Sequence, residues 1–331
     1  MQIQLGLARQ PGAWAPAGCA VTIGNFDGVH RGHQAMLAVL QGAARRRGLQ
    51  SCVLSFEPHP RDHFAARAGQ PELAPRRIAT LRDKVLELAH YGVDRCVLLR
   101  FDERLAGLSP QDFIRRVLID GLDARYVLVG DDFRFGARRA GDYAQLDAAG
   151  QAHGFEVARM SSFEVHGLRV SSSAVREALG EGDMAQAQLL MGRPYAVSGH
   201  VVRGRRLGRE LGFPTLNLRF GHPRPAAQGI FVARVHGLTA EPLPAVASFG
   251  VRPTIEDAGR VLLEAHCLDW PFARELPAAA AADYAYGRCV QVELAHKLHD
   301  ELRYESLDAL RAGIAADRDA ARAWLARHAA A

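Results

Sequence analysis

The sequence has little lysine, few aromatic residues and no long hydrophobic run. Only Lys84 and Lys297 are lysines among 41 basic residues, so nearly all the positive charge is guanidinium, which suits bidentate phosphate binding. Codon bias in an arginine-rich proteome would produce the same composition. No run of about 18 apolar residues and no N-terminal signal region occur, so neither a membrane span nor secretion is supported. We therefore expect a cytoplasmic protein.

Cysteine is also scarce, and the spacing of the cysteines indicates neither a metal site nor a disulfide framework. The five cysteines are odd in number and form neither a C-x-x-C pair nor a zinc spacing. This pattern favours buried thiols in a reducing compartment over a disulfide framework or a metal site. The residues concerned are Cys19, Cys52, Cys96, Cys267 and Cys289.

The remaining composition is that of an ordinary globular protein. The chain has 331 residues, of which 48% are hydrophobic and 23% charged, which predicts two domains with their own cores. The net charge of +5 raises the possibility of a nucleic-acid-binding protein. Aromatic residues make up only 7%, however, and no interleaved aromatic and basic motif occurs, so we expect no nucleic-acid partner.

The first half alternates short apolar runs with helical patterns. A helix start is indicated at Thr80, and Ser109 followed by Pro110 indicates another. Such alternation predicts βαβ units in a mainly parallel sheet, whose ligands bind beyond the carboxyl ends of the strands. The expected strands cover residues 19–23, 52–56, 95–99, 126–129 and 155–158.

Residues 24–33 follow the first of these strands and read G-N-F-D-G-V-H-R-G-H. Glycines permit a tight turn with close backbone approach to a ligand, and the next helix offers unpaired N–H groups to an anion. His30 and His33 are three residues apart at this helix start, so both imidazoles can face one phosphate. The motif predicts a phosphate-binding site.

The second half has a different periodicity. Asp183 is expected to cap a short helix that Gly192 and Pro194 end, and we place the domain boundary between residues 184 and 185. The domains are thus 1–184 and 185–331. An Ala-rich stretch at 277–282 looks like a flexible insertion without function. A small antiparallel barrel closed by a helix over 307–325 is predicted from β-rich runs at 197–202, 230–235, 261–268 and 289–294.

Residues 204–217 form a glycine-rich stretch with glycine at every fourth position. It lacks the G-K-[ST] ending of a Walker A loop, which excludes a P-loop NTPase. Thr215 and Asn217 point the same way in an extended segment, so a hydroxyl and an amide oxygen could hold Mg²⁺. A turn is the alternative for such a pair. Glu264 lies on the face opposite Leu263 and Ala265 and could be an ordinary solvent-facing carboxylate.

The first-half motifs resemble those of a known superfamily. H-x-G-H at residues 30–33 and S-S-S-A-V-R at 171–176 are similar to the two signatures of nucleotidylyltransferases, with Ser173 in the place of a threonine. Together with F-E-P-H-P at 56–60 and G-D-D-F-R-F-G at 130–136, they resemble the bacterial bifunctional riboflavin kinase/FMN adenylyltransferases. The resemblance implies a Rossmann-like domain that transfers adenylate from ATP to FMN and releases pyrophosphate.

The second half resembles the riboflavin kinase part of the same family. Residues 204–217 are similar to its Gly-rich loop and Pro-Thr-Ala-Asn motif, with Leu216 replacing alanine, and 250–254 match G-x-R-P-T. The resemblance makes Glu264 the general base of ATP-dependent riboflavin phosphorylation. This chain departs from the family at Arg288, where a lysine is usual, and at His299, where an arginine is usual.

The resemblance implies two ATP sites, with Mg²⁺ as cofactor and ATP, riboflavin and FMN as substrates. The expected catalytic residues are His30, His33 and Glu264, and the expected metal ligands are Thr215 and Asn217. A non-catalytic flavin carrier is the alternative, and it is disfavoured because these residues occur together. The expected nucleotide-binding residues are Gly24, Asn25, Phe26, Asp27, Asp132, Arg169, Ser172, Ser173, Arg176, Gly204, Gly208 and Gly212.

Overall fold

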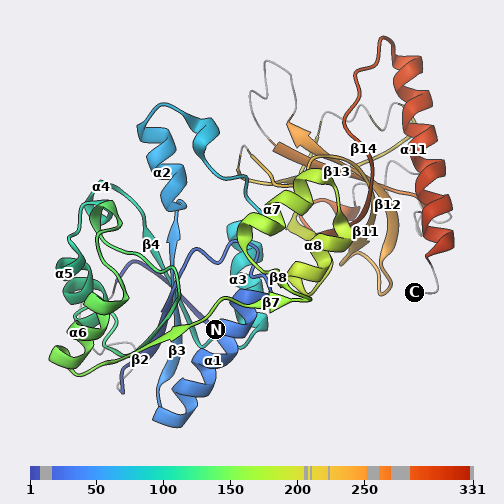
Figure 1. The fold of residues 1–331 in the computed structure, drawn as a ribbon. Coiled ribbons are helices and arrows are strands. Elements are labelled where there is room, and N and C mark those ends of the chain that lie inside the picture. The colour runs from blue at the N-terminus through green and yellow to red at the C-terminus, as the bar shows by residue number, and fades with distance from the viewer. Residues whose placement is uncertain are drawn as a thin grey trace. The chain divides into compact units, whose positions relative to one another are not determined.

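A computed structural model describes residues 1–7, 17–204, 208, 211–222, 224–251, 261–269 and 284–328. Residue contacts divide the chain into two units (Figure 1). The first unit comprises Met1–Pro75 and Lys84–Val170, and the second comprises Arg76–Asp83 and Ser171–Ala331. The predicted division of activities at residue 184 stays a prediction. The Ala-rich stretch 277–282 and all three arginines of the 204–217 loop lie outside the described residues.

The first unit is built on a six-stranded sheet in which every pairing is parallel. This confirms the predicted α/β class with a Rossmann-like parallel sheet. The edge strand β1 was not expected from the sequence. In spatial order the strands are β1 (Gln2–Leu5), β4 (Arg95–Arg100), β3 (Gln50–Glu57), β2 (Cys19–Ile23), β5 (Ala124–Gly130) and β6 (Glu156–Met160).

Helices cover both faces of this sheet. On one face, α1 (Arg31–Arg47) and α3 (Leu81–His90) pack through Leu37 and Leu88 against β3 and β4. On the other face, α5 (Pro110–Phe113), its π-helical continuation η2 (Ile114–Ile119) and α6 (Tyr143–His153) form the larger core. Shorter elements are α2 (Pro60–Arg67), η1 (Pro71–Leu73), α4 (Glu103–Ala106), η3 (Ala137–Arg139) and the hairpin of β7 (Glu164–Val165) and β8 (Leu168–Arg169).

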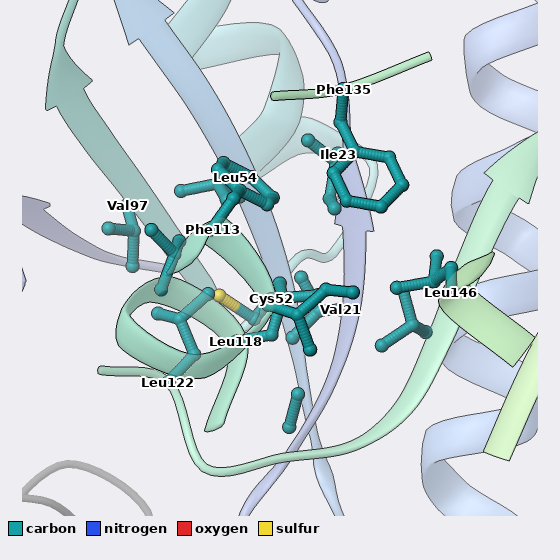
Figure 2. Packing of buried hydrophobic residues seen from close by; sticks show 14 of the residues in the cluster. Val21, Ile23, Cys52, Leu54, Val97, Phe113, Leu118, Leu122, Phe135 and Leu146 are labelled. Carbon is teal, nitrogen blue, oxygen red and sulfur yellow. The ribbon is translucent and has the colours of Figure 1, made fainter. Parts of the chain in front are cut away.

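The larger core brings together residues that are far apart in the chain. Figure 2 shows side chains from β2, β3 and β4 converging on those of α5 and η2, with Phe135 at one end of the cluster. Cys52, Leu54, Val97 and Leu118 are fully or almost fully buried there. Because the strands read as continuous apolar runs, they are buried on both faces, as is typical of parallel sheets.

Local capping explains where the helices begin and end. The Ser109 hydroxyl accepts the amide of Asp112 at 3.0 Å, and Pro110 follows at the first helical position. Asp183 accepts the amide of Gln186 at 2.8 Å and starts α8 (Met184–Met191), which Gly192 ends in the left-handed conformation. These boundaries confirm the predicted helix starts and stops.

The second unit is an antiparallel six-stranded sheet whose two edges meet. Val202, just beyond β9, donates its amide to the Asn217 carbonyl of β10 at 2.8 Å, so the sheet is a nearly closed barrel. Helix α11 (Leu307–Arg327) packs through Ala321 and Trp324 against Val232 and Val246. This confirms the predicted barrel with its terminal helix. The strand order is β10 (Leu216–Arg219), β13 (Val261–Cys267), β12 (Leu243–Val251), β11 (Gly229–His236), β14 (Cys289–His299) and β9 (Ala196–His200).

An eight-residue strap from the first half of the sequence, Arg76–Asp83, belongs to this second unit together with α7 (Ser172–Glu181) and α8. Arg77 donates its amide to the Arg224 carbonyl at 2.7 Å, and the buried Tyr195 hydroxyl donates to the Ile78 carbonyl at 2.9 Å. At the end of the strap, the Asp83 carboxylate accepts the amide of Ser198 in β9 at 3.0 Å. The strap is thus bound to the barrel along its length.

We expect Asp83→Ala to destabilise the second unit by about 1 to 3 kcal/mol, because the buried Ser198 amide would lose its acceptor. Asp83→Asn retains an acceptor oxygen and serves as the matched control. Burial raises the pKa of Asp83 above its usual 3.8, because the folded state favours the neutral carboxyl. The contribution of this carboxyl to folding stability is therefore full below pH 3.8 and is lost as the pH rises through the folded-state pKa. Urea unfolding of the two variants and the parent chain should therefore favour Asp83→Asn progressively above pH 3.8. An Asp83→Ala midpoint equal to that of the parent would contradict the assignment.

All five cysteines are free thiols, and all but the half-buried Cys289 are buried. Burial raises the pKa of the Cys267 thiol to about 12 and that of Cys96 to about 11, so these thiols stay protonated at neutral pH. This agrees with the prediction of structural thiols. Among the described residues, none of the helices combines the length and apolar character that crossing a membrane requires.

Candidate active sites

The loop between β2 and α1 has an unusual backbone conformation. Phe26, Gly28 and Val29 all have positive φ, at 50°, 85° and 40°. Phe26 and Val29 are buried in the core against α1 and α3, and this packing compensates for the strain of a left-handed conformation in residues with a side chain. A Cβ at Gly24 would lie 3.1 Å from the Phe26 ring. The loop is therefore held in one shape at the carboxyl end of β2.

The two predicted catalytic histidines are adjacent at the start of α1. Their rings stack with centroids 3.7 Å apart, and the His33 ring also contacts Phe26 at 4.7 Å. His30 caps the helix, since its Nδ1 accepts the amide of His33 at 3.4 Å. A Cβ at Gly32 would lie 3.3 Å from the His30 ring and 3.4 Å from the Val170 carbonyl, so glycine permits this close approach. Both imidazoles thus lie at a helix N-terminus, where anions are favoured.

Ser172, Ser173 and Arg176 lie in the first turns of α7, behind the cap Ser171, whose hydroxyl accepts the Ala174 amide at 3.2 Å. The Arg176 Nε donates to the Arg76 carbonyl at 2.7 Å. These residues belong to the second unit by contact, whereas the histidines belong to the first. Their predicted role in nucleotide binding stays a prediction.

Acidic and basic groups gather at the carboxyl end of β5. Arg169, on the β7–β8 hairpin, lies 3.6 Å from Asp131 and 3.8 Å from Asp132. The Ser162 amide and hydroxyl donate to Asp131 at 3.1 and 2.6 Å, and this bonding lowers the pKa of its carboxyl. Asp132 is 82% exposed. The structure thus brings the predicted residues Asp132 and Arg169 together, with Asp131 as their structural support.

A cavity of about 570 Å³ opens beside Gly24 and Asn25. The Oδ1 atom of Asn25 is buried and has no hydrogen-bond partner among the described residues, which makes it available to a ligand. Aromatic rings and guanidinium groups form most of the wall, which is the chemistry of a site for a planar ring carrying an anionic group. The lining includes Phe56, His59, Arg61, Phe64, Phe101, Phe113, Asp132, Phe133, Arg134, Phe135, Arg138 and Arg139.

Most of these lining residues were not predicted as site residues from the sequence. The motifs at 56–60 and 130–136 contain several of them, but Phe101, Arg138 and Arg139 belong to no motif. Arg138 and Arg139 do share one signal, because both have positive φ, at 55° and 57°. Two consecutive non-glycine residues in this conformation are rare, and such strain is concentrated at binding sites.

In the second unit, Asn217 of β10 is 5% exposed. Its Nδ2 donates to the Thr215 carbonyl at 3.2 Å and lies 3.5 Å from the Thr215 hydroxyl, whereas its buried Oδ1 has no hydrogen-bond partner among the described residues. A Cβ at Gly204 would lie 2.7 Å from this Oδ1, so a larger residue there would have to displace the Asn217 amide. Leu216, between the two predicted metal ligands, is buried in the barrel.

Glu264 lies in the same row of the sheet as Asn217. The register pairs Asn217 with Glu264 and Glu264 with Ser248, so the three side chains share one face of the barrel. Leu263 and Ala265 are fully buried on the opposite face, as the alternation predicted. The Ser248 hydroxyl donates to Glu301 at 3.0 Å, which places a second carboxylate beside this row. The sequence did not indicate this neighbour.

The other two predicted glycines lie close to this row in the chain. The amide of Phe213 donates to the Gly208 carbonyl at 2.6 Å, and a Cβ at Gly208 would collide with the Phe213 carbonyl. Gly212 has a φ of 88°, which favours glycine. The Nδ1 of His266 donates to the Pro214 carbonyl at 2.9 Å, and burial lowers the pKa of this imidazole. The predicted match at residues 252–254 lies outside the described residues.

Comparison with known proteins relates the chain to flavin enzymes. Residues 13–174 match the FAD synthetase family and residues 191–325 the riboflavin kinase family. A bifunctional riboflavin kinase/FMN adenylyltransferase from Escherichia coli K12 is 45% identical over 92% of each chain. The chain belongs to this family. The corresponding protein of Pseudomonas fluorescens is 44% identical over 92% of this chain and 93% of its own.

Membership of the bifunctional riboflavin kinase/FMN adenylyltransferase family confirms the predicted function, an enzyme with riboflavin kinase and FMN adenylyltransferase activities. The crystal structure of a macrolide-efflux protein from Streptococcus pneumoniae has a similar fold. Its TM-score is 0.71 at 25% identity, and the match covers 97% of this chain and 99% of the other. The roles expected of the individual site residues stay predictions.

Proposed function

We propose that the two activities of this enzyme use two separate sites, one in each unit. The observation that carries the proposal is that each unit holds a buried amide oxygen without a hydrogen-bond partner among the described residues. That of Asn25 lies in the loop that leads into the paired histidines, and that of Asn217 is paired in register with Glu264. Riboflavin is phosphorylated at the Glu264 site, and the resulting FMN is adenylylated at the histidine site. The products are FAD and pyrophosphate.

At the first site, FMN occupies the aromatic cavity with its ring against the phenylalanines. The arginines of the wall hold its phosphate, which attacks the α-phosphorus of ATP and displaces pyrophosphate without a covalent enzyme intermediate. His30 and His33 donate hydrogen bonds to the oxygens that gain charge as the phosphoanhydride breaks. Gly24, Phe26 and Asp27 shape the loop that receives the nucleotide. Asp132 and Arg169 contribute to the nucleotide site of the first unit, whereas nucleotide binding by Ser172, Ser173 and Arg176 stays a prediction.

At the second site, the riboflavin 5′-hydroxyl attacks the γ-phosphorus of ATP and ADP leaves. Glu264 accepts the hydroxyl proton as the new O–P bond forms. Gly204, Gly208 and Gly212 allow the backbone to approach the phosphates closely. The position of Glu264 between Asn217 and Ser248 supports this role, because it places the base beside the proposed phosphate-binding groups.

The donor set at Asn217 and Thr215 fits Mg²⁺. A hard cation takes amide and hydroxyl oxygens, and the buried Oδ1 of Asn217 is such a ligand without a partner among the described residues. When bound, Mg²⁺ would neutralise charge on the transferred phosphate. ATP, riboflavin and FMN are the proposed small-molecule partners, with neither nucleic acid nor membrane. Five free thiols support a reducing, cytoplasmic location.

The test is incubation of the chain with riboflavin, ATP and Mg²⁺, with riboflavin, FMN and FAD separated by chromatography. We expect FMN to appear first and FAD to follow, and chelation of Mg²⁺ to stop both steps. FMN supplied directly should yield FAD without riboflavin. Absence of FAD in that last incubation would refute the proposed histidine site.

Asn217→Ala should raise the Mg²⁺ concentration needed for half-maximal riboflavin phosphorylation roughly tenfold, which is about 1.4 kcal/mol of binding free energy. FAD formation from FMN should keep its Mg²⁺ dependence, because Asn217 lies in the second unit. The measurement is a Mg²⁺ titration of each activity. An equal shift in both titrations would contradict the assignment of Asn217 to one site.

A further inference from the structure

Lys84 is one of two lysines in the chain, and its side chain is only 2% exposed. It lies in α3, which packs on the sheet through Val85 and Leu88. Burial of an ammonium group is costly unless the charge is paired, so a buried lysine in an arginine-rich protein calls for a specific reason. Arginine, the common cation here, has a planar and larger head group.

The buried ammonium group of Lys84 forms an ion pair with Glu57. The Lys84 Nζ lies 3.5 Å from the Glu57 carboxylate, which is 34% exposed. The positive charge of Lys84 also opposes the effect of burial on the pKa of the Cys96 thiol, which places the ammonium beside β4 as well as β3. Lys84 thus lies beside the carboxyl end of β3, where Glu57 stands, and near Cys96 of the neighbouring strand β4.

Glu57 is the last residue of β3, and the chain on both sides of it forms the wall of the cavity. Phe56, on the opposite face of the strand, lines the cavity directly. The Glu57 carbonyl accepts the amide of Phe101, another lining residue, at 3.3 Å. Two residues later, His59 caps α2 by accepting the Arg61 amide at 3.1 Å. The position of the strand end therefore determines the positions of Phe56, Phe101 and Arg61 in the cavity wall.

We propose that Lys84 is a positioning residue for FMN adenylylation, which acts through Glu57 to hold the end of β3 and hence the aromatic wall of the flavin cavity. Lys84 is not among the described residues that line that cavity. The inference rests on the proposed assignment of the cavity to FMN. An anchor on the face opposite the ligand fixes Phe56 without occupying the space that the ring needs.

The test compares Lys84→Met with the parent chain in steady-state FAD formation. Loss of the charge should raise KM for FMN by roughly 10- to 100-fold, since small displacements of a binding wall have effects of this size. KM for ATP should not change, and riboflavin phosphorylation by the same molecules should also be unaffected. The matched control is Arg115→Met, which removes an exposed ion pair with Asp112 in the same unit and should leave KM for FMN unaltered.

A double-mutant cycle tests whether Lys84 acts through Glu57. Glu57→Ala should raise KM for FMN as Lys84→Met does. The double variant should have a KM no higher than that of either single variant, because both changes break the same Lys84–Glu57 ion pair. Glu57→Gln keeps an acceptor for the ammonium and should restore most of the affinity. If Lys84→Met does not fold, Glu57→Ala still carries the test, because it leaves the lysine in place.

Three results would overturn the proposal: an unchanged KM for FMN, equal increases in KM for FMN and ATP, or additive effects in the double variant. Each of these results is compared with the KM values of a parent chain that converts FMN to FAD. A parent chain that makes no FAD from FMN would instead refute the adenylylation site itself. Failure of the inference and failure of the proposed function are therefore distinguishable.

Discussion

His33→Ala should lower the rate of FAD formation from FMN by roughly 100- to 1,000-fold, the usual effect of losing one donor to a developing negative charge. The His33 ring stacks on His30 at 3.7 Å and touches Phe26 at 4.7 Å, so its position is held from two sides. Riboflavin phosphorylation should stay at the parent rate, because Glu264 and Asn217 lie in the other unit. Chromatography of the flavins after timed incubation with MgATP measures both rates in one sample.

Two comparisons separate this effect from damage to the fold. His153→Ala removes an exposed imidazole at the end of α6 in the same unit and should change neither rate. His33→Asn retains a hydrogen-bond donor and should keep more activity than His33→Ala. Equal loss of FMN and FAD formation in His33→Ala would show that the histidine pair does not serve one activity alone.

Glu264→Gln should produce the opposite result. Without a general base, riboflavin phosphorylation should fall by roughly 100- to 10,000-fold, whereas FMN added directly should still become FAD at the parent rate. The glutamine keeps the size of the side chain in the row between Asn217 and Ser248, so packing in the barrel is preserved. The measurement is the initial rate of FMN formation from riboflavin at saturating MgATP.

Glu305→Gln is the control for this change, since Glu305 is an exposed carboxylate of the same unit. It should phosphorylate riboflavin as the parent chain does. Residual kinase activity of Glu264→Gln that rises with pH would fit a remaining solvent base. A kinase rate equal to that of the parent would assign the proton transfer to another group, and Glu301 would then be the next candidate because it reaches the same row through Ser248.

Much of the fold could be predicted because its signals are local. The caps at Ser109 and Asp183 and the alternation around Glu264 depend on residues only a few positions apart, and all of them agree with the structure. The edge strand β1 could not be predicted, because four residues pairing with β4 leave too short a pattern. Strands β10 and β12 were missed for related reasons, since β10 has only four residues with Asn217 and Arg219 among them, and Pro, Ser and Gly interrupt the apolar run of β12.

The sites divide in the same way. The motifs identified His30, His33, Asn217 and Glu264 as groups with suitable chemistry, and the structure places them in two clusters. The cavity could not be predicted, since Phe56, Phe64, Phe101 and Phe133 come from segments with no common pattern. The burial of Lys84 could not be predicted either, because a lysine in an amphipathic helix ordinarily points to solvent.

By itself, the sequence determined the kinds of chemistry that this protein carries and the class of each half, because glycine turns, helix caps and apolar periodicity act over a few residues. The tertiary structure decided which side chains meet. Strand order brings β4 beside β3, and sheet register sets Asn217 beside Glu264. Both depend on hydrogen bonds and packing between segments distant in the chain, whose free energies no short stretch of residues specifies.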